Sequence, residues 1–342
     1  MHVEGLKKGD YVPDTSYKII NDFQGSANGQ FSFAEKEGKK YFVKAFIKPK
    51  YPSDLISAGQ LREDKIKRSK AFEHQHERLL EIFRDNFLEE GQIVYPVDFI
   101  RYNCTFMQFS PFVETFSKNT KNISSEIFEK KFLLLKTLTN AISMLHNNRV
   151  VHSDLKPDNI LVKETYAKVL SAKLIDFDGS YISEDPHPKD FLHFDQSYMA
   201  PELSLYNQDD ENIKKRMMTD KTDIFSLGII FHEYITGKRP EISGKEHNDI
   251  QYIGDAINSD CEVNLSTDIL GEKLSALIRS MIAKDYTKRP SAEDILSELN
   301  TIVIAKSFDE PRISSTEKGP AITTDKLSTG QKFTIITKKK KL

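Results

Sequence analysis

The most informative stretch of the sequence reads His152-Ser153-Asp154-Leu155-Lys156-Pro157-Asp158-Asn159. It brings a carboxylate, an ammonium group and a carboxamide into one short loop. Asp154 could accept the proton of an attacking hydroxyl, Lys156 could neutralise charge on a migrating phosphoryl group, and Asn159 could bind a magnesium ion. The stretch therefore predicts a site for phosphoryl transfer from ATP, with Asp154 and Lys156 as the catalytic residues.

A second motif follows seventeen residues after Asn159, where the chain reads Asp176-Phe177-Asp178-Gly179 behind the apolar Leu174 and Ile175. An aspartate at the end of a strand is suited to a second magnesium contact, which we assign to Asp176. Together the two motifs resemble those of the eukaryotic-type (Hanks-type) serine/threonine protein kinase family, H-R-D-L-K-P-x-N and D-F-G. The resemblance implies ATP and Mg²⁺ as cofactors, with Asn159 and Asp176 as the metal ligands.

Lys44 lies in the segment Y-F-V-K-A-F, which is similar to the V-A-I-K strand of the family. A lysine between apolar strand residues is costly unless its charge is paired. The resemblance implies that phosphate oxygens and a helix glutamate pair with it. We choose Glu77 for that glutamate, from the helical pattern at 65–84, while Glu73 and Gln75 remain open as alternatives.

The resemblance also implies other nucleotide contacts. The family's L-G-x-G-x-x-G-x-V loop keeps only one of its three glycines here, Gly29, but small residues dominate from Ser26 to Gly29. The backbone of Ser26 and Gly29 could therefore approach phosphate. In the strand that leads to the hinge, Met107 would lie behind the adenine as the gatekeeper, and the backbone of Gln108 and Ser110 would bind the adenine edge.

Three segments match the second half of the family pattern. They are Ala200-Pro201-Glu202 for A-P-E, Thr222 to Gly228 for D-x-W-S-x-G, and Lys288 to Ser291 for the R-P-S/T segment. The resemblance implies that Glu202 forms a buried ion pair with Arg289. It also implies that Asp223 holds the backbone of the catalytic loop.

Two residues depart from the family pattern. Ser153 stands where the family often has an arginine that clamps a phosphorylated activation segment, so we expect the site to need no such phosphate. Asp178 replaces the glycine of D-F-G, with Gly179 one place later, which leaves Asp176 intact but removes backbone freedom at that position. Lys156, two residues after the catalytic aspartate, is typical of kinases that act on serine and threonine.

Hydrophobic periodicity predicts a strand-rich first part and a helix-rich second part. The segments 17–47, 93–100 and 105–109 contain strand-like patterns, whereas 65–84 and the chain from Ser124 onward have helical spacing. We therefore expect an α+β, bilobal protein-kinase-like fold. Its parts are a strand-rich N-lobe over 1–109, a helical C-lobe over 110–305 and a flexible basic tail over 306–342.

The amino-acid composition indicates the class of protein and the cellular compartment to expect. The chain has 342 residues, 38% of them hydrophobic and 29% charged, which suits a globular protein, and its net charge of −2 gives no reason to expect specific nucleic-acid binding. The two cysteines, Cys104 and Cys261, lie far apart in the sequence and favour a reducing, cytoplasmic setting. We expect no membrane span and no secretion signal. The oligomeric state stays open.

These observations favour an ATP-dependent serine/threonine protein kinase that transfers the γ-phosphoryl group to protein Ser/Thr hydroxyls and also phosphorylates itself. Candidate acceptors in the tail are Ser314, Ser315, Thr316, Thr323 and Thr324. One alternative is a pseudokinase scaffold, favoured by the degraded glycine loop and by Asp178. Another is a small-molecule phosphotransferase of the aminoglycoside or choline kinase type, whose I-D-x-D motif resembles Ile175 to Asp178.

Overall fold

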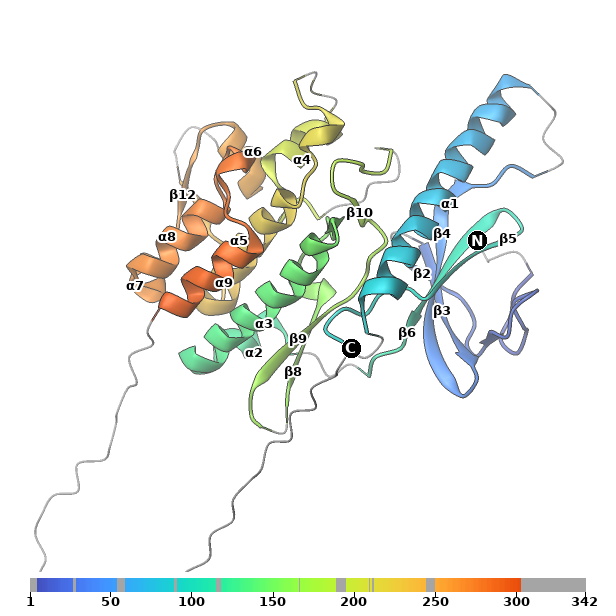
Figure 1. Ribbon diagram of the computed structural model, residues 1–342, viewed down its shortest axis with the longest axis horizontal. Coiled ribbons are helices and arrows are strands. Elements are labelled where there is room, and N and C mark those ends of the chain that lie inside the picture. Colours follow the sequence, from blue (N-terminus) through green and yellow to red (C-terminus); the bar gives the residue numbers. More distant parts are fainter. Residues whose placement is uncertain are drawn as a thin grey trace, which may run out of the picture. The chain divides into compact units, whose positions relative to one another are not determined.

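A computed structural model shows the architecture of the chain (Figure 1). The structure describes residues 5–26, 29–53, 59–88, 91–114, 118–165, 167–188, 195–208, 210, 212–243 and 250–302. All of these residues fall in one compact unit, Met1–Val303. The predicted tail over 306–342, with its candidate phosphorylation sites, lies outside the described residues.

The first part of the unit is built on a six-stranded antiparallel sheet with the order β1-β3-β4-β6-β5, in which β2 also pairs with β3. Its strands are β1 (Lys18–Ile19), β2 (Gln24–Ser26), β3 (Gly29–Lys36), β4 (Lys39–Lys50), β5 (Asp98–Tyr102) and β6 (Thr105–Pro111). The strand predicted over 93–100 starts only at Asp98, because Pro96 lacks the N–H that a ladder needs. The sheet core is apolar on the face that carries Val43, Ala45 and Met107.

The long helix α1 (Gln60–Asn86) packs against β4 and β5 (Figure 1). Its buried side chains recur every three or four residues, as an amphipathic helix requires. They are Ser69, Phe72, His76, Leu79, Leu80 and Phe83. The helix is longer than the segment 65–84 that the sequence predicted, and it covers the other face of the sheet through an aromatic cluster of Phe46, Phe72 and Phe106.

The second part of the unit is helical, which confirms the predicted α+β kinase-like fold. Its elements are α2 (Thr120–Ser124), α3 (Phe128–Asn147), α4 (Pro201–Asn207), η3 (Lys215–Met217), α5 (Lys221–Thr236), β11 (Glu241–Ser243), α6 (Ile253–Asn258), β12 (Glu262–Asn264), α7 (Thr267–Leu270), α8 (Glu272–Met281), η4 (Tyr286–Lys288) and α9 (Ala292–Thr301). α5 is buried on nearly every side and packs against α2, α3 and α8. Gly237 ends it in the left-handed conformation at φ 85°.

Short strands carry the two predicted motif loops. β7 (Val150–Val151) pairs with β10 (Tyr181–Ile182), and β8 (Ile160–Glu164) forms a hairpin with β9 (Leu170–Leu174). The catalytic-loop sequence leaves β7 and enters β8 through the 3₁₀ turn η1 (Pro157–Asn159), while Asp176 follows β9. The hairpin therefore fixes both motifs side by side.

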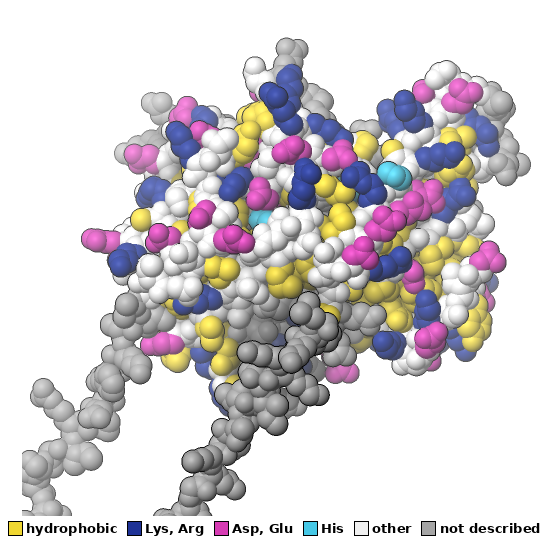
Figure 2. All heavy atoms as spheres, in the orientation of Figure 1, with side chains coloured by type: hydrophobic (Ala, Val, Ile, Leu, Met, Phe, Trp, Pro, Cys, Tyr) yellow, Lys and Arg dark blue, Asp and Glu magenta, His cyan; other side chains and the backbone are white. Residues whose placement is uncertain are grey.

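Acidic and basic side chains are interspersed over the face of the molecule shown in Figure 2. This mixture agrees with the small net charge of −2. None of the helices in the described part of the chain combines the length and the apolar character that a bilayer crossing demands.

Candidate active site

The catalytic-loop residues meet at the carboxylate of Asp154. The Nζ atom of Lys156 lies 2.8 Å from Asp154 Oδ2. Asn159 donates from Nδ2 to the backbone oxygen of Asp154 at 2.8 Å and to its Oδ2 at 3.0 Å. Because the amide donors of Asn159 are used in this way, its carbonyl oxygen is the atom suited to a cation.

The charge on Lys156 is stabilised by its neighbours. Burial by itself would lower the pKa of this ammonium group. Its hydrogen bond to Asp154, with the charges of Asp195 and Asp176 nearby, outweighs burial and raises the pKa above the ordinary value. Lys156 is therefore a fixed positive charge beside the carboxylate at neutral pH.

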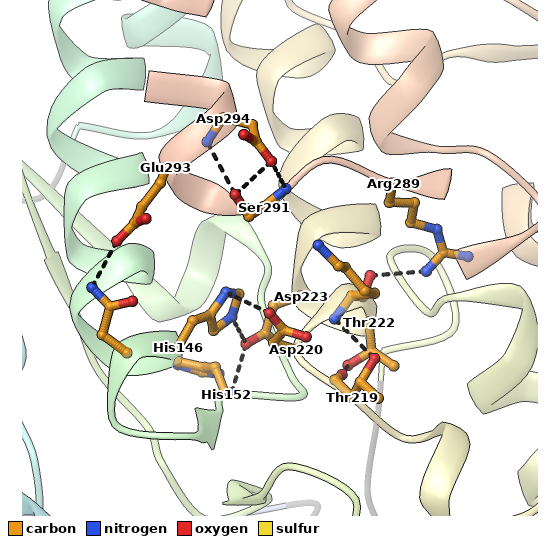
Figure 3. Close-up of polar contacts among 12 residues, drawn as sticks. His146, His152, Thr219, Asp220, Thr222, Asp223, Arg289, Ser291, Glu293 and Asp294 are labelled. Carbon is orange, nitrogen blue, oxygen red and sulfur yellow. Dashed lines mark hydrogen bonds and ion pairs between the residues drawn. The ribbon is translucent and has the colours of Figure 1, made fainter. Parts of the chain in front are cut away.

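The buried carboxylate of Asp223, in the first turn of α5, holds the backbone of the loop (Figure 3). Its Oδ2 accepts the backbone N–H of His152 and its Oδ1 accepts that of Ser153, both at 2.8 Å. The ring of His146 lies 3.0 Å from the same Oδ2. A fully buried carboxylate that accepts these bonds fixes the backbone next to Asp154, as the family resemblance implied.

Two residues of the motif loops have a backbone conformation that is unfavourable for any residue other than glycine. Ser153 has φ 69° and Asp176 has φ 63°. Such strain persists only where the surroundings enforce it, and it concentrates at functional sites. At Ser153 the hydroxyl donates to the backbone oxygen of Gly179 at 2.7 Å, which ties the two motif loops together.

A pocket of about 330 Å³ lies where the sheet and the hairpin meet. Phe33 and Phe42 of the sheet contribute aromatic rings to its lining, and Leu161 and Ile175 contribute aliphatic side chains from the hairpin region. Its polar lining residues include Lys44, Gln108, Asn159, Asp176 and Asp178. The predicted residues Lys44, Asn159 and Asp176 are thus brought to one cavity.

The pocket fits a nucleotide with magnesium. Apolar rings on one part of the lining suit a flat base, and Lys44 suits phosphate oxygens. Mg²⁺ prefers oxygen ligands and is usually held by one or two carboxylates together with substrate phosphates. The carboxylate of Asp176, 38% exposed, and the amide oxygen of Asn159 match that requirement.

The hinge prediction was wrong by one residue. Met107 is fully buried in the sheet core beside Val43 and Ala45, so it faces away from the pocket. Gln108 faces the pocket instead, because neighbouring strand residues point to opposite faces. Its backbone is engaged in the sheet, where it pairs with Lys44 on β4, so its side chain rather than its backbone reaches the site.

The remaining hinge residue, Ser110, lines the pocket, and its backbone contact with the adenine edge stays a prediction. Gly29 does not, and the structure gives it a packing role: a Cβ there would lie 2.6 Å from the backbone oxygen of Ala45. Ser26 pairs with Gly29 across the turn between β2 and β3, and its side chain lies outside what the structure describes. Phosphate binding by Ser26 and Gly29 stays a prediction.

The expected pairing of Lys44 with Glu77 was also wrong. Glu77 is exposed on α1, whereas the buried face of the helix carries His76 at the adjacent position. The Nζ atom of Lys44 forms ion pairs with Asp178 Oδ2 and, at 3.4 Å, with Asp176 Oδ1. Sequence reasoning missed this role of Asp178, although the aspartate in place of glycine was the visible signal.

Of the two alternative helix residues, Glu73 is half-buried and Gln75 donates from Nε2 to the backbone oxygen of Asp185 at 3.2 Å. It therefore contacts the segment that follows the second motif rather than Lys44. The carboxylate of Asp185 is itself paired with Arg78 of α1 at 3.2 Å and with Lys215 at 2.6 Å. The hydrogen bond from Lys215, with help from Arg78, holds the pKa of Asp185 below its ordinary value.

The fold and the site together define a protein kinase domain, and the comparison with protein families agrees. The family described as "Protein kinase domain" matches residues 34–299, so the chain belongs to the protein kinase family. This confirms the resemblance drawn from the sequence motifs. Its buried Glu202–Arg289 pair, with two contacts of 2.7 Å, matches the pairing that the resemblance implied.

Several curated proteins are similar to this chain. Serine/threonine-protein kinase ELM1 of Saccharomyces cerevisiae is 30% identical over 58% of this chain and 31% of its own length. Myosin light chain kinase 2 of Mus musculus is 22% identical over 82% of this chain and 44% of its own length. Putative serine/threonine-protein kinase R436 of Acanthamoeba polyphaga mimivirus is 29% identical over 52% of this chain and 59% of its own length. The chain thus spans less than two thirds of each relative.

Proposed function

We propose that this chain is a serine/threonine protein kinase that uses ATP and Mg²⁺. The convergence of Asp154, Lys156 and Asn159 with Lys44 and Asp176 on one pocket carries the proposal. When bound, ATP and Mg²⁺ would supply the transferable γ-phosphoryl group and the charge that neutralises its oxygens.

The side chains have separate tasks in this proposal. Asp154 orients the acceptor hydroxyl and takes up its proton, and Lys156 places a positive charge where the phosphoryl group passes. Lys44 binds phosphate oxygens, while Asn159 and Asp176 hold the metal. The backbone N–H of Asp195 donates to Asp154 Oδ1 at 3.1 Å and so helps to fix that carboxylate.

The test is phosphate transfer from labelled ATP to a panel of proteins by the full chain. Asp154→Ala should lower the rate roughly 100- to 10,000-fold, because a positioned acid or base contributes about that much. Asp158→Ala is the matched control, since Asp158 lies in the same loop but is exposed. Equal rates for the two variants, or turnover with small-molecule acceptors only, would refute the proposal.

Serine and threonine are the proposed acceptors, including those in the chain's own tail. Lys156, two residues after Asp154, supports this choice, as does the similarity to the yeast and mimivirus serine/threonine-protein kinases. Intact-mass measurement after incubation with ATP should show added phosphates on serine or threonine. Phosphotyrosine as the sole product would contradict the assignment.

We further propose that the site is ordered without phosphorylation of the activation segment. Ser153 ties the two motif loops together, and Asp185 supplies a carboxylate that Arg78 and Lys215 already hold. Protein treated with phosphatase should therefore retain its initial rate. Loss of activity on that treatment, with recovery on rephosphorylation, would overturn the idea.

The cytoplasm is the proposed location. Cys104 and Cys261 are both free thiols and both half-buried. Thiols in this state are stable where the compartment is reducing. Fractionation of the source cells, with an antibody against the chain, would test the location.

A further inference from the structure

The side chain of Lys44 is mostly buried, so its neighbours determine the position of its ammonium group. Its side chain is 14% exposed and projects from β4 toward the pocket. The side chain of Asp178 is 16% exposed and pairs with it through Oδ2. Asp176 is the more open of the two aspartates at 38%, and its Oδ1 lies 3.4 Å from the Nζ atom of Lys44.

A side chain of the sheet holds the carboxylate of Asp178 in place. Gln108 donates from Nε2 to Asp178 Oδ1 at 2.7 Å. Gln108 is directly opposite Lys44 in the β4–β6 ladder, so both side chains leave the same face of the sheet on neighbouring strands. The two oxygens of Asp178 are thereby divided between an amide donor and an ammonium group.

No carboxylate lies among the buried side chains of α1. α1 is described along its whole length, and its buried side chains are one serine, one histidine and four apolar residues. Glu77 lies on the exposed face. His76, at 3% exposed, packs against Phe46 and Phe99 and has its Nδ1 2.9 Å from the backbone oxygen of Phe72.

His76 cannot act as a charged partner either. Burial, together with the smaller effect of the neighbouring His187, lowers its pKa to about 3. The ring is therefore neutral at physiological pH. An imidazole is neutral or positive but never negative, so His76 cannot balance the ammonium charge of Lys44.

We propose that Asp178 is the positioning residue for Lys44 and takes the place of a helix glutamate. This inference rests on the proposed kinase function. An ammonium group in a largely dry site needs a counter-charge, and removal of one partner leaves the other uncompensated. Asp178 meets this need from the loop that follows Phe177, with Gln108 as its support. The position of Lys44 is thus coupled to that loop and to β6 rather than to α1.

The experiment compares Asp178→Asn with Glu77→Gln in the full chain. Both changes remove one carboxylate charge with almost no change in shape. Because a misplaced reacting group costs on the order of a hundredfold in rate, Asp178→Asn should lower kcat/KM for ATP by roughly that factor. Glu77→Gln should leave both kcat and KM unchanged. Asp178→Glu, which restores the charge, should recover part of the rate.

Three further measurements separate this role from others. Thermal unfolding shows whether each variant is folded, and a merely structural role would lower Tm without changing KM for ATP in the folded fraction. Titration with Mg²⁺ identifies a metal ligand: full recovery of Asp178→Asn at high Mg²⁺ would overturn the proposal. So would a loss in Glu77→Gln as large as that in Asp178→Asn.

Binding of Mg·ATP, measured by calorimetry, keeps the inference testable if phosphoryl transfer is absent. A wild-type chain that binds Mg·ATP but transfers no phosphate refutes the proposed function alone. The role of Asp178 then stands if Asp178→Asn binds more weakly than Glu77→Gln. It fails if the two variants bind with the same affinity, or if the wild-type chain does not bind the nucleotide.

Discussion

The pair of Glu202 and Arg289 offers the sharpest test of how the helical part is held together. The guanidinium donates to both carboxylate oxygens at 2.7 Å and to the backbone oxygens of Ala283 and Lys221, both at 2.8 Å. It also lies 5.0 Å from the ring centre of Phe225. The Arg289 side chain is 0% exposed and that of Glu202 is 4% exposed. Every strong contact of the guanidinium is therefore made inside the protein.

Glu202→Gln keeps the volume but removes the negative charge. It also turns one acceptor into a donor that faces the guanidinium. Breaking a buried pair from one side costs about 3–5 kcal/mol, because the remaining charge cannot reach water. Tm shifts by about 2–4 °C per kcal/mol in domains of 150–250 residues and by less in larger ones, so we expect a drop of roughly 5–10 °C.

Thermal unfolding of the full chain, followed by circular dichroism, provides the measurement. Asp260→Asn is the matched control, because the pair of Lys284 and Asp260 has a similar separation of 2.6 Å but exposures of 50% and 82%. Such surface pairs contribute about 0–1 kcal/mol. A Glu202→Gln protein that melts within about 1 °C of the control would refute the reasoning, since burial would then make no difference.

Two more predictions concern packing and pH. Gly29→Ala should lower Tm, because its Cβ would meet the backbone oxygen of Ala45 at 2.6 Å, whereas Gly25→Ala has open space and should leave Tm unchanged; equal effects would contradict this. Burial lowers the pKa of His76 to about 3 and that of His187 to about 4, so below the ordinary value of 6.5 the unfolded chain binds more protons and stability falls as the pH falls. At pH 5 each histidine should cost about 2 kcal/mol relative to neutral pH. Urea unfolding of His76→Phe should show a shallower pH dependence between 6.5 and 4, and an unchanged slope would contradict the assignment.

The sequence motifs correctly predicted the site residues that lie close together in the sequence. Asp154, Lys156 and Asn159 share one loop, so their spacing alone brings them together. Asp223 lies about 70 residues away, but it belongs to a motif of its own with a known partner loop. Family resemblance could therefore place it without any knowledge of the contacts.

The predictions that were wrong concern residues whose orientation depends on strand register or on the face of a helix. Met107 and Gln108 are both plausible neighbours of the pocket in the sequence, and only the pairing of β6 with β4 decides which one faces it. On α1, His76 and Glu77 are adjacent polar residues, so the sequence did not mark His76 rather than Glu77 as the inward position. The contact between Gln108 and Asp178 joins residues 70 apart and follows from the same register.

The ring of Phe42 in the pocket lining gives this protein a practical advantage for spectroscopy. The chain contains no tryptophan, so its intrinsic emission comes from tyrosine alone. Phe42→Trp would place a single indole reporter against the bound base, in a position where only an aromatic ring is exchanged for another. Quenching of that lone indole, excited at wavelengths where tyrosine absorbs little, would then report nucleotide arrival directly.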